Sequence, residues 1–244
     1  MSPRDTQIVL IPYDFESSAH HARLVQQRVS CGFGAEQVDG LTAWCKDGTT
    51  TIYWIVLSEE FPDREEAIAA HVQKYPEEIE TLTDTARITF KRPHNPSGVS
   101  FTPIGHVGVA QKPSVDARIG LPPDIPIAWL IAIYTSWVLQ GRGIGGSAMR
   151  AAEAIAADPT GPIGARLMVL DSIPESLQFD ATYQDMFYVE RGLPLPLISN
   201  QKWYEKQGYR WFRDMELEEP IMWTQGDRTI PIQLGYYKKF LVSG

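Results

Sequence analysis

The feature that most limits how this chain can fold is an apolar run over residues 128–135, followed by a glycine-rich turn and an amphipathic helix. Residues 128–135 are apolar or β-branched almost throughout, which is the pattern of a strand buried on both faces. Over residues 143–157 the apolar side chains recur at helical spacing. A buried strand that leads directly into such a helix is typical of folds that mix strands and helices in one core.

The rest of the chain extends this pattern. Further strands are predicted over residues 7–12, 50–57, 87–91, 104–110, 166–170, 209–215 and 231–240. Helices are predicted over residues 16–29, 63–75 and 200–207. Two long stretches interrupt them, a proline-rich link over residues 111–126 and an insert over residues 171–197. We therefore expect an α/β (α+β) fold, a mixed central sheet flanked by helices, formed by residues 1–244 as a single domain.

Composition narrows the range of functions. The net charge of −8 disfavours binding to nucleic acid and is compatible with cationic substrates. Cys31 and Cys45 are too few for a disulfide framework and lack metal-ligand spacing, so no metal site is expected. No segment has the pattern of a secretory signal or of a membrane span. A cytoplasmic protein, monomeric or homodimeric, is the expectation.

The glycine turn has the composition of an anion site. It comprises Gln140, Gly141, Arg142, Gly143, Ile144, Gly145 and Gly146. Glycines let the backbone approach a ligand closely, and the first amides of the following helix lack internal partners. A pyrophosphate would suit such a helix N-terminus. The spacing also fits the GxGxxG pattern of dinucleotide-binding units with Asp171 as the acidic residue, but the further β–α units of that fold do not follow.

Two segments resemble the signatures of the GNAT N-acetyltransferase superfamily. Gln140-x-x-Gly143-x-Gly145 resembles its acetyl-CoA motif, and the segment from Trp203 to Tyr209 (WYEKQGY) resembles its second signature. The resemblance covers residues 104–244, fits residues 1–100 only loosely, and is strongest to the larger GNAT-domain proteins of fungi.

The resemblance implies a site between two parallel strands that splay apart, here residues 128–135 and 166–170. Backbone groups of Ile133, Tyr134 and Thr135 would pair with pantetheine, and the turn would hold the pyrophosphate. Asn200 occupies the approximate place of the asparagine that often begins the fourth helix of the family. The amine would attack the thioester directly, with acetyl-CoA as cosubstrate and without a metal.

The same resemblance suggests catalytic roles. Tyr204 is the candidate acid for the leaving thiolate, although a purely packing role is an alternative. His106 is a candidate base, although a histidine in a strand is more often structural or solvated, and alternation allows it to face a cleft or solvent. Asp171 could orient an amine or a water, although a residue at the end of a strand is more often structural. In the insert, acidic residues interleave with aromatic ones, which suits either a lid over a cationic or aromatic amine or an ordinary amphipathic segment. These residues are Glu175, Asp180, Asp185, Glu190, Phe179, Tyr183, Phe187 and Tyr188.

The leading functional hypothesis is therefore transfer of an acetyl group to a primary amine of a small molecule. A protein or peptide N-acetyltransferase, and a non-catalytic acyl-CoA-binding module, are the alternatives. Neither the acceptor nor the general base follows from the sequence.

Overall fold

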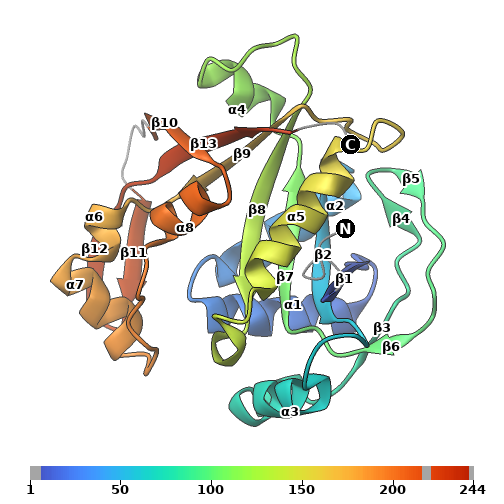
Figure 1. Cartoon of the computed structure of the whole chain (residues 1–244), viewed down its shortest axis with the longest axis horizontal. Coiled ribbons are helices and arrows are strands. Elements are labelled where there is room, and N and C mark those ends of the chain that lie inside the picture. Colours follow the sequence, from blue (N-terminus) through green and yellow to red (C-terminus); the bar gives the residue numbers. More distant parts are fainter. Residues whose placement is uncertain (1–6, 216–220, 242–244) are drawn as a thin grey trace.

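The computed structural model describes residues 7–215 and 221–241. Its centre is a seven-stranded mixed sheet with the spatial order β1-β2-β7-β8-β9-β13-β10 (Figure 1). The strands are β1 (Ile8–Pro12), β2 (Thr50–Leu57), β7 (Gly105–Ala110), β8 (Ile127–Thr135), β9 (Leu167–Ser172), β10 (Arg210–Asp214) and β13 (Gly235–Phe240). All neighbouring strands in this sheet are antiparallel except β8 and β9, which are parallel. The predicted mixed α/β class is confirmed.

Helices cover both faces of the sheet. In Figure 1, α5 (Ile144–Ala157) crosses in front of the sheet while α1 (Ser18–Cys31) and α2 (Val38–Lys46) lie behind it. The other helices are α3 (Arg64–Lys74), α4 (Pro113–Arg118), α6 (Glu175–Gln178), α7 (Ala181–Gln184) and α8 (Asn200–Lys206). Short 3-10 turns, η1 (Ala35–Gln37), η2 (Pro76–Glu78) and η3 (Trp137–Leu139), and the π-helical turn η4 (Asp185–Val189) join them.

Three two-stranded sheets lie outside the main sheet in the described residues. They pair β3 (Leu82–Thr83) with β6 (Ser100–Phe101), β4 (Ile88–Thr89) with β5 (Arg92–Pro93), and β11 (Ile221–Gln225) with β12 (Arg228–Ile232).

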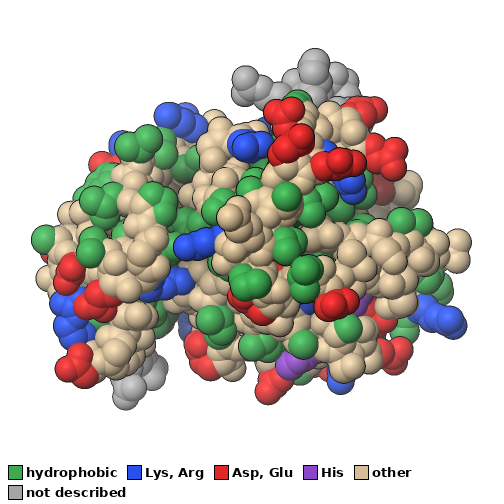
Figure 2. All heavy atoms as spheres, turned by 90° about the horizontal axis from the view of Figure 1, so that it is seen from below, with side chains coloured by type: hydrophobic (Ala, Val, Ile, Leu, Met, Phe, Trp, Pro, Cys, Tyr) green, Lys and Arg blue, Asp and Glu red, His purple; other side chains and the backbone are tan. Residues whose placement is uncertain are grey.

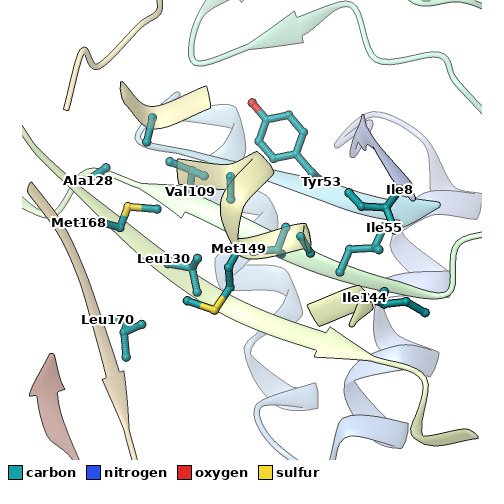
Figure 3. Packing of buried hydrophobic residues seen from close by; sticks show 14 of the residues in the cluster. Ile8, Tyr53, Ile55, Val109, Ala128, Leu130, Ile144, Met149, Met168 and Leu170 are labelled. Atoms are coloured by element: carbon teal, nitrogen blue, oxygen red, sulfur yellow. The ribbon is translucent and has the colours of Figure 1, made fainter. Parts of the chain in front are cut away.

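The core follows from alternation along the strands. On the α5 side, side chains of β2, β7, β8 and β9 pack against one stripe of α5, as Figure 3 shows for Ile55, Val109, Leu130, Met149 and Met168. On the opposite side, a second cluster joins β2 to α1 and α2. Because both faces are covered, β2 and β7 are buried along their whole length.

Four sequence expectations about local structure were wrong. The strand expected over residues 87–91 is reduced to the two residues of β4, because Phe90 and Lys91 form a turn with positive φ. The link over residues 111–126 contains α4, which begins at a proline, a residue that is tolerated in the first helical turn. The strand expected over residues 231–240 is divided between β12 and β13. Residues 171–172 of the expected insert belong to β9, and most of the following residues form α6, α7 and η4.

A β-bulge in β8 decides which side chains reach each face. His106 pairs with Tyr134, but Gly108 pairs with Ile131, so β8 carries one residue more than β7 in this stretch. Ala132 lies in the left-handed region with φ 48°, which is unusual for a residue with a Cβ. Because the extra residue reverses the alternation, Ile133 joins the α5-side core while Tyr134 contacts His106 on the α1 side.

A buried acid fastens α5 to the strands that follow α8. Glu153 of α5 accepts a hydrogen bond from the Tyr209 hydroxyl at 2.9 Å and pairs with the Lys239 ammonium at 2.7 Å. We expect Glu153→Ala to lower the free energy of unfolding by about 2 kcal/mol, because it leaves a buried hydroxyl and a partly buried cation without partners. Urea denaturation measures this, and Glu153→Gln should lose less. An unchanged midpoint in Glu153→Ala would contradict this account.

Candidate functional site

The parallel strands β8 and β9 separate towards their carboxyl ends. They pair only where Ile127–Trp129 faces Leu167–Val169. From Leu130 onwards, no strand in the described part of the chain pairs with the β9 side of β8. The backbone of Ile133, Tyr134 and Thr135 therefore borders an opening that an extended ligand could fill by adding to the strand edge.

The glycine turn lies directly beyond the end of β8. Gly141 and Gly143 both have φ 82°, a left-handed conformation that favours glycine, and Gly143 is the N-cap of α5. Gln140, Gly141, Arg142 and Gly143 are exposed, whereas Ile144 is buried in the core. Within residues 7–215 and 221–241, the amides of residues 141–146 have no hydrogen-bond acceptor. Unpartnered amides at the positive end of a 14-residue helix are available to an anion.

Helix α8 packs against this turn. A Cβ on Gly145 would lie 3.1 Å from the indole ring of Trp203, and one on Gly146 would lie 3.4 Å from the Gln207 amide oxygen. Gly145 therefore allows the close approach of α8 to the N-terminus of α5. This contact brings the two segments of the family resemblance together, although the sequence alone gave no distance between them.

Tyr204 of α8 lies among aromatic residues below the opening. Its side chain is 7% exposed and its ring is near those of Trp203, Tyr209 and Tyr237. Burial raises the pKa of Tyr204 well above its usual range, and the negative charge of Asp171 adds to this effect. The phenol therefore stays protonated at neutral pH.

Asp171 is half-buried near the carboxyl end of β9. Burial raises the pKa of this carboxyl, while the ammonium of Lys112 opposes the shift. Lys112 itself lies over the Trp129 ring, 4.4 Å from its centroid. A carboxylate with a raised pKa binds a proton more readily than a solvated aspartate does.

His106 is fully buried, so the expectation that it faces a cleft or solvent was wrong. Its Nδ1 lies 2.9 Å from the Gln27 amide oxygen, and the Gln27 amide nitrogen donates to Glu78 at 2.8 Å. Helix α1 covers the face of β7 that alternation left open. Burial lowers the pKa of His106 well below its usual range, and Arg28 adds to the shift. A neutral histidine in a buried network fits a structural role.

Asn200 is exposed and bonded to the insert. Its backbone amide donates to the Gln178 side-chain oxygen at 2.7 Å, and its own side-chain oxygen accepts from Gln178 at 3.4 Å. The cap of α8 is Ser199, whose hydroxyl accepts from the Lys202 amide at 3.1 Å and donates to Glu175 at 2.6 Å.

The acidic side chains of the insert are bonded within the fold. Glu175 accepts from Ser199, and Asp180 caps α7. Asp185 and Glu190 both pair with Arg228 of the β11–β12 hairpin. These partners favour the amphipathic-segment interpretation of the insert over an acidic lid.

The aromatic side chains of the insert form a separate cluster. Tyr183, Phe187 and Tyr188 pack with Phe33, Trp137 and Trp223. In Figure 2, the lobe that contains the insert and the hairpin stands apart from the body that contains α1 and α3, with a hollow between them.

Sequence reasoning missed the residues that join this lobe to α1. Arg191 donates to the carbonyls of Val29, Ser30 and Cys31 at 3.3, 2.8 and 3.4 Å, and its guanidinium lies over the Phe187 ring. A Cβ on Gly32 would overlap this guanidinium. The only sequence signal is a pair of glycines after a predicted helix, which indicates a helix end but not the arginine that covers it.

The described residues contain no group of three or more His, Cys, Asp or Glu side chains placed to hold a metal ion. Within the same ranges, no helix combines the length and hydropathy needed to cross a bilayer.

Comparisons with known proteins give matches at the level of structure alone. No family model and no curated protein sequence matches the chain. Solved structures similar to it include a GNAT-family acetyltransferase from Staphylococcus aureus Mu50 (10% identity, TM-score 0.46, covering 96% of this chain and 99% of that one). An aminoglycoside 6'-N-acetyltransferase complexed with coenzyme A has 10% identity and a TM-score of 0.47, with 96% and 97% covered.

A third similar structure is the Salmonella typhimurium acetyltransferase that modifies the N-terminal serine of ribosomal protein L7/L12. It has 11% identity and a TM-score of 0.49, with 98% of each chain covered. Because these sequence identities and TM-scores are low, the function of the chain has to be inferred from its own geometry. The resemblance to fungal proteins stays a prediction.

Proposed function

We propose that this chain is an acetyl-CoA-dependent N-acetyltransferase of the GNAT type. One observation carries the proposal: the opening between β8 and β9 lies beside a helix N-terminus whose amides from residue 141 to residue 146 are unpartnered. Pantetheine would add to the free edge of β8 at Ile133, Tyr134 and Thr135. The pyrophosphate would bind the turn from Gln140 to Gly146, with Asn200 at the margin of the site.

The chemistry needs only the chain's own residues and the two substrates. The amine nitrogen attacks the thioester carbon, the carbon–sulfur bond breaks, and an amide and the thiol of CoA result. The amine arrives as an ammonium and must lose a proton first, because its pKa is about 10. Asp171 is the proposed acceptor of that proton, since burial raises its pKa. Tyr204 then protonates the leaving thiolate, and His106 supports the site from the buried network.

The proposed acceptor is a small molecule in the cytoplasm, and the chain acts as one domain, monomeric or homodimeric. Two observations support the single domain and the cytoplasmic location. Residues 7–57 contribute β1 and β2 to the same sheet as the site, and both cysteines are free thiols, as in a reducing compartment. A peptide terminus is the alternative acceptor.

Binding and turnover measurements test the proposal together. We expect acetyl-CoA to raise the melting temperature and to bind with micromolar affinity in calorimetry, whereas NAD and ATP should have no comparable effect. A panel of amines and short peptides, followed by release of free thiol, identifies the acceptor class. Binding of NAD in preference to acetyl-CoA would disprove the assignment. Acetyl-CoA binding without turnover of any acceptor would favour a non-catalytic acyl-CoA-binding module.

A further inference from the structure

Arg28, in the last turn of α1, is a buried cation without an anionic partner. It is 8% exposed, and among the residues that the structure describes it forms no ion pair. Its Nε is buried without a hydrogen-bond partner. The one side-chain hydrogen bond of its guanidinium within the described residues is long, 3.9 Å from Nη1 to the Cys31 sulfur. Burying a guanidinium is unfavourable unless a carboxylate or a similar group compensates its charge.

The end of α1 does not compensate this charge. Backbone carbonyls at a helix C-terminus attract cations, but here they have other partners. The Gly32 amide donates to the carbonyls of Arg28 and Val29, and Arg191 donates to those of Val29, Ser30 and Cys31. The charge of Arg28 is therefore available to a group from outside the protein.

The last turn of α1, which carries Arg28, lies next to β8, the strand that borders the opening. The charge of Arg28 acts on His106, which faces Tyr134 across the β7–β8 pair. The neighbouring Cys31 is near enough to affect the titration of Tyr134, Tyr183 and Tyr204. Trp137, two residues after β8, donates to the Ser30 carbonyl at 2.9 Å and holds the end of α1 there.

The polar groups around this end of α1 favour an anion. The Tyr183 hydroxyl is buried and lacks a hydrogen-bond partner in the described residues, whereas the Tyr134 hydroxyl lies next to that of Tyr75, so Tyr183 is the available donor. The acidic side chains of the insert are bonded to Ser199, to α7 and to Arg228, as described above. Gly34 leaves room for the arginine, since a Cβ there would lie 2.7 Å from its terminal nitrogen.

We propose that the acceptor is an amine that also carries a carboxylate, and that Arg28 binds this carboxylate. The proposal rests on the acetyltransferase function proposed above and names its substrate class, amino acids and related amino acid-like amines. A bidentate arginine–carboxylate pair would orient the amine towards the thioester. Tyr183, Phe187 and Tyr188 are packed in the neighbouring aromatic cluster, so acceptors with apolar or aromatic side chains are included in the test.

The test compares acceptors that differ only in the carboxylate. Phenylalanine, tyrosine and leucine are each paired with their amino acid amide and their decarboxylated amine, and kcat and KM are measured by thiol release. We expect the wild type to prefer the carboxylate-bearing members. Arg28→Gln should raise their KM about a hundredfold, while KM for the carboxylate-free members and the affinity for acetyl-CoA stay unchanged.

Arg23 provides a matched control on the same helix. It is equally buried, but it donates to Gln26 and to the Glu80 carbonyl and lies near Glu78. We expect Arg23→Gln to lower the melting temperature without changing the preference for carboxylates. Arg28→Gln should fold at least as stably as the wild type, since it removes an uncompensated charge.

The possible failures are distinguishable. If the wild type turns over amines without regard to the carboxylate, or Arg28→Gln keeps the same profile, the inference about the acceptor is wrong and the acetyltransferase function stands. If the chain binds no acetyl-CoA, the proposed function fails. Calorimetry of the wild type with the same amino acids then still tests the anion site, and absence of an Arg28-dependent heat would overturn the inference as well.

Discussion

Replacing Tyr204 with phenylalanine is expected to lower kcat by about 10²–10⁴ while the affinity for acetyl-CoA stays nearly unchanged. The ring keeps its contacts with Trp203, Tyr209 and Tyr237, so only the proton donor is lost. Because burial and Asp171 raise the pKa of Tyr204, the phenol stays protonated through the neutral range. The loss of rate should therefore be uniform below the ordinary tyrosine pKa of about 10.

Steady-state kinetics and calorimetry check this prediction, and Tyr209→Phe is the matched control. Tyr209 is a neighbouring buried tyrosine whose hydroxyl bonds to Glu153, so its loss should reduce stability and leave kcat within a few fold of the wild type. A normal kcat in Tyr204→Phe would show that Tyr204 only packs and that water protonates the thiolate.

Introducing a negative charge at Gly146 is expected to weaken acetyl-CoA binding by roughly a hundredfold, because a carboxylate would repel the pyrophosphate at close range. Gly146 is the third residue of α5, and a side chain there meets Arg150 and Gln207 at ordinary contact distances. Glutamate is favoured in the first turn of a helix, so Gly146→Glu should fold with undiminished stability.

Gly146→Gln separates charge from volume, since it has the same shape and no charge. Calorimetry should show that it retains most of the affinity. Gly145 is a poorer probe, because a larger side chain there would collide with Trp203 and displace α8. Equal affinities in Gly146→Glu and Gly146→Gln would exclude the anion site at this turn.

The sequence predicted the elements whose pattern is set by burial. Strand β2 is buried on both faces and was found with its observed bounds, Thr50–Leu57. Helix α5 was placed within one residue, because its apolar stripe and the preceding glycines point to the same start. A local sequence pattern predicts an element correctly when the segments packed on both sides of that element require the same conformation.

Features that depend on distant contacts were not predictable. Whether His106 is buried depends on α1, and the charge of Arg28 is notable only because Arg191, far along the chain, takes the carbonyls nearby. The bulge at Ala132 depends on the register with β7 and leaves no mark in a run of apolar residues. These features depend on contacts between two distant segments, and the local pattern of either segment does not reveal them.

The position of β13 has a consequence for how the chain reaches this structure. β13 follows β10 in the sequence but lies between β9 and β10 in the sheet. During synthesis, one edge of β9 therefore has no strand to pair with until the insert, α8, β10, the β11–β12 hairpin and β13 have been made. An exposed edge of this kind can pair with other chains, and sheet closure over such sequence separation is slow. We therefore expect the insertion of β13 to be a late step of folding, before which the edge of β9 is open to aggregation.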